Sequence, residues 1–284
     1  MKRSRTGQSV IGTTLIYIVC IFLTILSIFP FWTMLVNATR STNEIQQHAV
    51  SLIPSSYLMN NWKIIIDKGS FQPLRGFMNS MIVSTFSTLC AVYFSTLTAY
   101  AIVIYDWKAR RAFFTFIMAV MMIPQQVVTI GFYQMIYKVH LTNNFLPLIL
   151  PSIAAPTMVF FMKQYMEPAL SKEIIQSARI DGAKEFFIFN RIALPIMKPA
   201  MATQAIFGFV ASWNNLYTPS IILATKANKG TMPMFVEALK SNDKQRDFGQ
   251  IYCGLFISVL PIMVAYFILS KYIVAGVALG GVKE

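Results

Sequence analysis

Long apolar stretches without an ionisable residue alternate with short charged segments along this chain. Six such stretches occur, at residues 10–39, 76–105, 112–137, 141–162, 199–225 and 248–270. Each is long enough to cross the ~30 Å hydrocarbon layer of a membrane as a helix, which takes about 20 residues. The pattern predicts six transmembrane helices, at approximately 10–36, 77–105, 112–137, 141–165, 200–223 and 250–273.

The apolar stretches do not alternate between apolar and polar residues, as the strands of a membrane β-barrel would. The composition agrees with a helical membrane protein, because 56% of the 284 residues are hydrophobic and only 12% are charged. Soluble domains carry about 25% charged residues. The predicted fold class is therefore an all-α membrane protein, which we expect to form a single transmembrane domain over residues 1–284.

The distribution of basic residues predicts the orientation of the chain. Six spans place both termini on one side of the membrane, and that side collects 14 of the 24 Lys and Arg residues. Short basic loops stay in the cytoplasm, so we expect both termini to be cytoplasmic in a multi-pass protein of the cell (inner) membrane. The formal net charge of +13 then reflects topology and contact with membrane lipid, and no nucleic-acid partner is expected.

The first apolar stretch and the three cysteines do not indicate a cleaved signal peptide, a disulfide framework or a metal site. The stretch from Val10 to about Ala38 exceeds the 7–15 residues of a signal-peptide core, so it predicts a retained anchor helix. Cys20, Cys90 and Cys253 all lie within apolar spans. Their positions favour small packing residues, and neither a disulfide framework nor a metal site is expected.

The longest polar segment on the predicted cytoplasmic side is the loop 167–198, between the fourth and fifth spans. Ser171 is suited to cap a helix beginning at Lys172, Gly182 should break that helix, and a second helical run over 183–191 should follow. Such short helices cannot insert into the membrane. They either cover their own bundle and the lipid headgroups or form a docking lever for a soluble partner.

The stretch KEIIQSARIDGAKEFFIFNRIALPIMKP, residues 172–199, resembles the "EAA" loop of ABC-importer permeases. Its matching parts are Asp181-Gly182-Ala183 and, further on, Ile192-Ala193-Leu194-Pro195. Other segments resemble the smaller permease subunit of the maltose-type carbohydrate importers: Asn79-Ser80, Ala99-Tyr100-Ala101, Ser212-Trp213-Asn214 and Gly280-Gly281-Val282-Lys283. The resemblance thus covers nearly the whole chain.

The resemblance implies a set of partners. They are a second permease subunit, two ABC ATPase subunits that bind ATP and Mg, and an extracellular or periplasmic sugar-binding protein. The residues implied to couple the permease to the ATPase are Gln176, Ser177, Ala178, Asp181, Gly182, Ala183 and Phe186. The family pattern has Glu where this chain has Gln176, which forms hydrogen bonds but carries no charge. We therefore expect either weaker ATPase contact here or a stronger contact in the partner permease.

The chain lacks an energy source of its own. It contains no G-x-x-x-x-G-K-[ST] phosphate-binding motif, and its spans contain no Asp, Glu or His that could relay protons. We therefore expect no catalytic residue, no bound metal or cofactor and no enzyme activity in this chain. ATP hydrolysis in a separate subunit would drive alternating access.

Sugar sites combine aromatic faces with amide and hydroxyl groups. The candidates to line a substrate path are Asn79, Tyr100, Trp213, Asn214 and Asn215. A tryptophan near the end of a span can instead act as an interfacial anchor, and amides within a membrane often form interhelical hydrogen bonds. Both interpretations remain open from the sequence.

Three other functions compete with sugar import. An importer permease for amino acids, peptides or polyamines would share the same loop. A secondary carrier or channel is disfavoured by the uncharged spans and by the loop 167–198. An intramembrane enzyme would need a motif such as H-E-x-x-H or paired membrane aspartates, and the sequence has neither.

Overall fold

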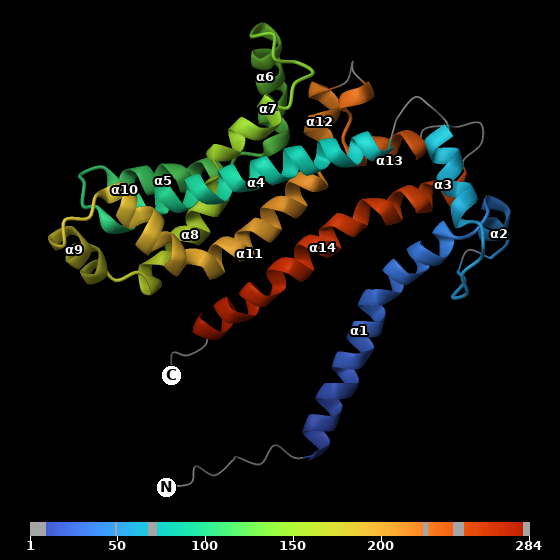
Figure 1. Ribbon diagram of the computed structural model, residues 1–284, viewed down its shortest axis with the longest axis horizontal. Coiled ribbons are helices and arrows are strands. Elements are labelled where there is room, and N and C mark those ends of the chain that lie inside the picture. The colour runs from blue at the N-terminus through green and yellow to red at the C-terminus, as the bar shows by residue number, and fades with distance from the viewer. Residues whose placement is uncertain (1–9, 49, 68–72, 224–226, 241–246, 281–284) are drawn as a thin grey trace. The chain divides into compact units, whose positions relative to one another are not determined.

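The computed structural model describes residues 10–48, 50–67, 73–223, 227–240 and 247–280. Within these ranges the regular structure is helical, as the apolar pattern predicts (Figure 1). Contacts between residues divide the chain into two compact units. The first unit comprises Met1–Lys68 and Ala238–Ile257, and the second comprises Gly69–Glu237 and Ser258–Glu284.

The described part of the first unit contains three whole helices, the end of α13 (Met232–Lys240) and the start of α14 (Phe248–Gly280). The three whole helices are α1 (Val10–Ala38), α2 (Thr42–Gln47) and α3 (Leu58–Asp67). Helix α3 includes the apolar residues Trp62, Ile64, Ile65 and Ile66, which lie between the first two predicted spans.

A buried arginine organises the segment between α1 and α3. Arg40 is only 6% exposed, and its guanidinium donates to the backbone oxygens of Glu44 at 2.7 Å and His48 at 2.8 Å. His48 is the C-cap of α2, where the helix dipole favours a cation. At the other end of α2, Ser41 and Glu44 form a capping box, and the hydrogen bond from the Ser41 backbone lowers the pKa of Glu44.

The second unit is built around one long helix. In chain order its elements are α4 (Pro73–Ile104), α5 (Arg110–Met121), α6 (Gln125–Lys138), α7 (Leu146–Ile149), the 3₁₀ turn η1 (Leu150–Ile153), α8 (Pro156–Ala169), α9 (Lys172–Ile180), α10 (Glu185–Ile188), the π turn η2 (Phe189–Ala193), α11 (Leu194–Trp213), α12 (Tyr217–Ile222), the 3₁₀ turn η3 (Ala227–Lys229), most of α13 (Met232–Lys240) and the rest of α14. Helix α4 packs against both α8 and α11.

Small side chains on α4 permit this close packing. Ser84, Thr88 and Thr96 are buried on it, in keeping with the small residues that line contacts between membrane helices. Opposite Thr88, α11 carries Gly208, where an added Cβ would lie 2.5 Å from the Cε of Met158 in α8. Three helices therefore meet at Gly208 with no room for a larger residue unless a side chain moves.

Among the described residues, five helical segments are long and apolar enough to cross a membrane: Gly12–Ala38, Pro73–Ile104, Leu146–Ala169, Glu185–Trp213 and Phe248–Ile268. The predicted span 112–137 is different, because it is divided into α5 and α6. Pro124 stands between them with an extended backbone (φ −62°, ψ 125°). With 12 and 14 residues, neither piece alone reaches the ~20 residues of a span.

The fourth and fifth predicted spans also differ in the structure. Span 141–165 becomes α7, η1 and α8, and each piece has a proline, Pro147, Pro151 or Pro156, in its first turn. A proline at the start of each piece is consistent with the division, because proline cannot complete the backbone hydrogen bonds of a continuous helix. Span 200–223 instead starts near Glu185, continues through Pro195 and Pro199 and ends at Trp213. Membrane helices tolerate such prolines where neighbours satisfy the backbone.

We predict that Gly249→Ala destabilises the first unit. A Cβ at Gly249 would lie 2.6 Å from the backbone oxygen of Arg40 and 2.8 Å from the Asn61 amide, and a backbone atom cannot easily move away. Overpacking of this kind costs about 1–3 kcal/mol. Thermal unfolding in detergent should show a lower midpoint for this variant.

The matched control is Gly208→Ala, whose nearest atom is the flexible tip of Met158. We expect a smaller loss of stability in the control. Equal midpoints for wild type and Gly249→Ala would contradict the packing described for this glycine.

Candidate functional site

The loop between α8 and α11 forms two short helices joined by a tight turn. Ser171 caps α9, because its Oγ accepts from the backbone N–H of Ile174 at 3.5 Å. At the other end, the N–H of Ala183 donates to Ala178 O and that of Gly182 to Arg179 O, both at 3.0 Å. This pair of bonds is a Schellman motif, and it places Gly182 at φ +81°. The predicted cap and glycine break are thus present.

The second predicted helix of the loop is longer than expected. We expected it to end before Leu194, but α10, the π turn η2 and α11 run on continuously from Glu185 to Trp213. A π turn adds one residue to the helical repeat. Here it lies just before Pro195 and lets the helix pass from the loop into the fifth span without a break.

The two loop helices, α9 and α10, have one packed face and one open face. Ile175, Ala178 and Ile188 are buried in the core of the second unit. By contrast, Ile180 is 86% exposed and Phe186 is 76% exposed. Ile180 lies between the spans, and Phe186 lies at the very start of the apolar segment Glu185–Trp213. Apolar side chains this exposed at such positions are suited to contact another protein.

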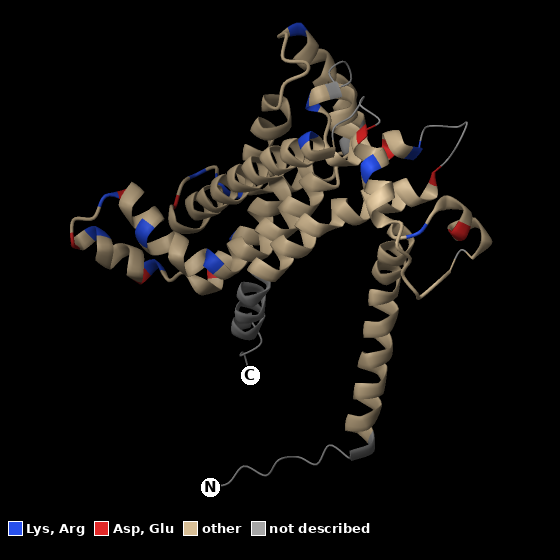
Figure 2. Cartoon of the chain, turned by 45° about the vertical axis from the view of Figure 1, so that its right-hand side comes forward, with Lys and Arg blue, Asp and Glu red and all other residues tan. Residues whose placement is uncertain are grey.

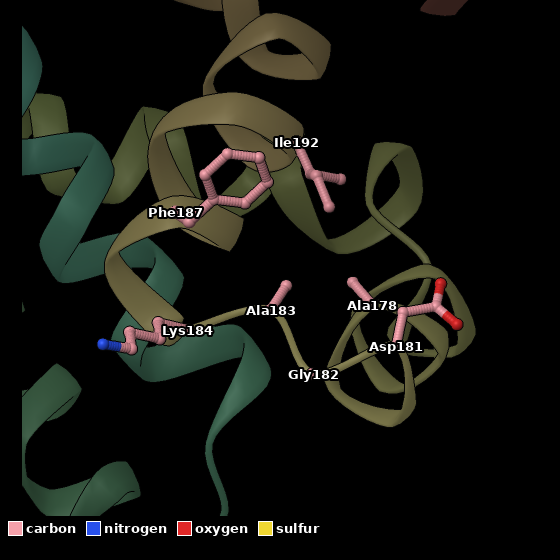
Figure 3. Close-up of a pocket in the computed structure, with 7 residues that line it drawn as sticks. All are labelled: Ala178, Asp181, Gly182, Ala183, Lys184, Phe187 and Ile192. Carbon is pink, nitrogen blue, oxygen red and sulfur yellow. The ribbon is translucent and has the colours of Figure 1, made fainter.

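An open hollow of about 540 Å³ lies between α9 and α10 (Figure 3). Figure 3 shows the methyl groups of Ala178 and Ala183 facing this space, with Phe187 and Ile192 on the opposite wall, while Lys184 points away. Seven residues line it: Ala178, Asp181, Gly182, Ala183, Lys184, Phe187 and Ile192. The hollow suits an apolar side chain of a partner.

Four of the seven predicted coupling residues line this hollow, namely Ala178, Asp181, Gly182 and Ala183. Gln176, Ser177 and Phe186 lie outside it and are exposed on the same two helices. All seven lie within residues 176–186, so their proximity follows from the sequence, and their role in coupling stays a prediction. Among the described residues, no three His, Cys, Asp or Glu side chains cluster as metal ligands would.

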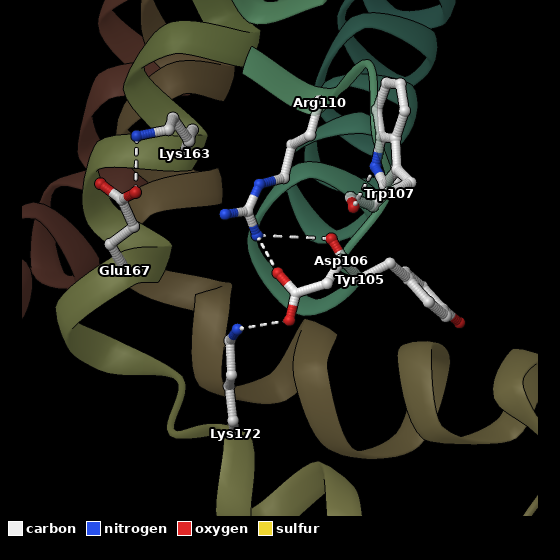
Figure 4. Close-up of polar contacts among 8 residues, drawn as sticks. Tyr105, Asp106, Trp107, Arg110, Lys163, Glu167 and Lys172 are labelled. Carbon is white, nitrogen blue, oxygen red and sulfur yellow. Dashed lines mark hydrogen bonds and ion pairs between the residues drawn. The ribbon is translucent and has the colours of Figure 1, made fainter.

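Polar contacts from the α4–α5 turn to the loop were not predicted from the sequence. The Tyr105 hydroxyl donates to Glu185, and Glu185 accepts from Arg179 at 2.6 Å. Asp106 lies 3.6 Å from Lys172 and 2.6 Å from Arg110 (Figure 4). The only signal in the sequence was that both segments are short and charged.

The five substrate-path candidates do not form one cluster. Asn79 lies near the start of α4 and Tyr100 near its end, so about 30 Å of helix separates them at 1.5 Å per residue. Tyr100 is 2% exposed and packs against Phe189 of the π turn with ring centroids 5.3 Å apart. Asn79 donates to the backbone oxygens of Asn228 and Gly230, both at 3.0 Å.

The remaining three candidates lie together where α11 ends. Trp213 is 1% exposed and its indole donates to Ser258 O at 2.9 Å. Asn214 is the exposed C-cap of α11, and the Asn215 side chain accepts from the Thr218 backbone at 3.2 Å. Of the five candidates, Asn214 is the most open to a ligand, and a role of each in the path stays a prediction.

Residues 91–278 match the family described as the binding-protein-dependent transport system inner membrane component. The chain belongs to this family. It is 30% identical over 263 residues to the arabinooligosaccharides transport system permease protein AraQ of Bacillus subtilis (strain 168), with 92% of each chain covered.

Two further comparisons bear on this family member. It is 27% identical over 254 residues to the sn-glycerol-3-phosphate transport system permease protein UgpE of Pectobacterium atrosepticum, covering 88% of this chain and 90% of that protein. Its fold matches a chain from the crystal structure of a bacterial ABC transporter involved in the import of the acidic polysaccharide alginate, with a TM-score of 0.78, 17% identity and coverage of 95% and 99%. The chain is thus a multi-pass inner membrane component with an importer-permease fold.

We predict that Gly182→Ala loosens the turn between α9 and α10. A side chain at φ +81° is strained by about 1–2 kcal/mol, because Cβ crowds the following carbonyl. Amide hydrogen exchange at Gly182 and Ala183, whose N–H groups close the Schellman motif, should become faster in the variant.

Gly131→Ala in α6 is the control, because a Cβ there has no atom within 4 Å. The backbone amide of residue 131 should exchange no faster in this control than in the wild type. Unchanged exchange at Ala183 in Gly182→Ala would contradict the proposed need for glycine at this position.

Proposed function

We propose that this family member is one of two permease subunits of an ATP-driven importer for a sugar or oligosaccharide. The observation that carries the proposal is the loop α9–α10, in which α9 is capped at both ends and exposed apolar side chains lie beside an open hollow. These features lie at the positions of the ABC-importer coupling loop. A soluble ATPase can dock on such a surface and move it.

The proposed topology has six spans, with both termini and the loop 167–198 in the cytoplasm. The five long apolar helices account for five spans, and α5 with α6 would supply the remaining crossing as two half-length pieces. Figure 2 shows that the long helices are almost free of charged residues, which gather on the loop helices and at helix ends. Basic residues in short loops favour the cytoplasmic side.

The energy for transport would come from the partner subunits. The sequence carries no phosphate-binding loop motif, so ATP and Mg would bind only to two ABC ATPase subunits, and this chain would have no enzyme activity of its own. Closure of the ATPases on ATP would displace α9 and shift the permease pair between inward-facing and outward-facing states. An extracellular or periplasmic binding protein would deliver the cargo to the outer side.

A carbohydrate cargo is supported by the name of the AraQ relative and by the sequence segments shared with maltose-type permeases. The name of the UgpE relative keeps another cargo in view as the second candidate. Asn214 and its neighbours at the end of α11 would be the first residues to test for substrate contact, because the side chain of Asn214 is exposed.

The proposal is tested by expressing this chain with its adjacent genes and purifying it in mild detergent. We expect a second permease and an ABC ATPase in the complex, and ATP hydrolysis that rises when a sugar-loaded binding protein is added. Recovery of the chain alone, active in transport without ATP, would instead support a secondary carrier. Stimulation only by a non-sugar ligand would favour the second candidate.

We also predict that Gln176→Glu preserves or tightens ATPase association. Gln176 is exposed on α9, where the family pattern has a carboxylate, and hydrogen bonds to charged groups contribute about 1.5–3 kcal/mol against roughly 0.5–1.5 for neutral ones. The amount of ATPase that co-purifies per permease measures the effect.

The control for this variant is Gln164→Glu, which makes the same change at an exposed position of α8. It should leave co-purification unchanged. Clear weakening in Gln176→Glu alone would show that the family's carboxylate contact does not transfer to this subunit.

A further inference from the structure

Helix α9 is connected to the rest of the chain by two short linkers, residues 170–171 and 181–184. The buried side chains of α9 are those of Ile175 and Ala178. Movement of α9 could therefore be lost in the linkers unless other contacts hold the helix. Polar contacts near both of its ends reach the same neighbour, the turn between α4 and α5.

The contact near the C-terminal end of α9 involves three residues from three segments. Glu185, the first residue of α10, accepts from the Tyr105 hydroxyl with one oxygen and from Arg179 Nε with the other, the latter at 2.6 Å. The guanidinium of Arg179 also lies over the Tyr105 ring, 5.2 Å from its centroid. The arrangement is closed, because each of the three side chains touches the other two.

Tyr105 and Arg179 both keep the protons that they donate in this contact. Partial burial, followed by the hydrogen bond to Glu185, raises the pKa of Tyr105. The hydrogen bond with Glu185 likewise raises the pKa of Arg179. Both side chains therefore remain donors throughout the physiological pH range.

The contact near the N-terminal end of α9 is looser. Lys172 Nζ lies 3.6 Å from an Asp106 oxygen, and the other Asp106 oxygen lies 2.6 Å from Arg110 at the start of α5 (Figure 4). Lys172 and Arg179 are seven positions apart, which corresponds to about 10 Å along a helix. A single contact would allow α9 to pivot, whereas two contacts this far apart also fix its direction.

We propose that Tyr105, Arg179 and Glu185, assisted by Asp106 and Lys172, form a brace that transmits movement of α9 directly to α4. The inference rests on the proposed function, because it assumes that an ATPase moves α9. The three principal members are positioning residues, since they touch neither substrate nor nucleotide. Without the brace, α9 would still move α11 through α10, but α4 would not follow in step.

The packing of α4 makes the direct connection from α9 to α4 through the brace important. Tyr105 directly follows Ile104, the last residue of α4, and α4 packs against both α8 and α11. Packed side chains and rigid helices of this kind can carry coupling between distant sites. Partly exposed ion pairs contribute little to stability, so loss of the brace should affect coupling far more than folding.

The test uses the complete complex in proteoliposomes with the variants Tyr105→Phe and Glu185→Gln. Tyr105→Phe removes one hydroxyl and keeps the ring, so it should fold. We expect the ATPase to co-purify as in the wild type and basal ATP hydrolysis to stay within about two-fold. The sugar transported per ATP should fall by about five-fold or more, the lower end for coupling between sites.

Exchanging the charges of Arg179 and Glu185 supplies a measurement that a merely structural role of these residues would not change. Arg179→Glu and Glu185→Arg should each lower sugar transported per ATP, and the double variant should recover at least part of it. The control is Glu167→Gln, which breaks the 2.6 Å ion pair with Lys163 within α8 (Figure 4). This pair does not reach α9, so transport per ATP should remain at the wild-type value.

Two results would overturn the brace while leaving the proposed function intact. One is wild-type transport per ATP in both Tyr105→Phe and Glu185→Gln. The other is loss of the ATPase from either purified variant, which would indicate a docking role. If the wild-type complex itself contains no ATPase, the proposed function fails and the brace fails with it.

Discussion

The second unit depends on one constraint, which is that backbone groups in a membrane must find partners within the protein. The fourth predicted span departs from this rule locally, because Pro151 has no N–H and the 3₁₀ turn η1 interrupts the α-helix there. Helix α4 repairs the break, since the Ser87 hydroxyl donates to Leu148 O at 3.1 Å. Further along, Ser95 donates to Ala155 O at 3.4 Å beside the next proline, Pro156. The buried hydroxyl groups of α4 therefore allow α7, η1 and α8 to be discontinuous.

The features that depend on local chemistry could be predicted from the sequence. Long uncharged runs gave the helical membrane fold, and the cap at Ser171 and the turn at Gly182 follow from side-chain chemistry over a few residues. The division of the third predicted span at Pro124 was not predicted, although the proline was visible. Charge alone locates apolar runs, but a proline in such a run can either stay within a helix, as Pro199 does in α11, or stand where a helix ends.

The contacts between distant segments could not be predicted. Tyr105 and Glu185 are 80 positions apart, and their meeting depends on how α4, α8 and α11 pack. The same packing separates the residues that the sequence pattern assigned to one substrate path. Tyr100 resembles a path residue by its motif, yet it contacts Phe189 in the π turn beside the loop helices. Periodicity places a residue on a face of a helix, but it does not say which helix covers that face.

Local side-chain chemistry and contacts between distant segments have complementary consequences for the loop α9–α10. A surface that transmits force must be open to its partner and firmly held by its own chain. The local features make it open, because the Gly182 turn separates α9 from α10 and leaves Ile180 and Phe186 exposed. The long-range contacts hold it, because α10 continues through the π turn into α11 while Tyr105 ties Glu185 to the end of α4. The loop is thus attached to two membrane helices at once, and a displacement of α9 would turn both together rather than bend one against the other.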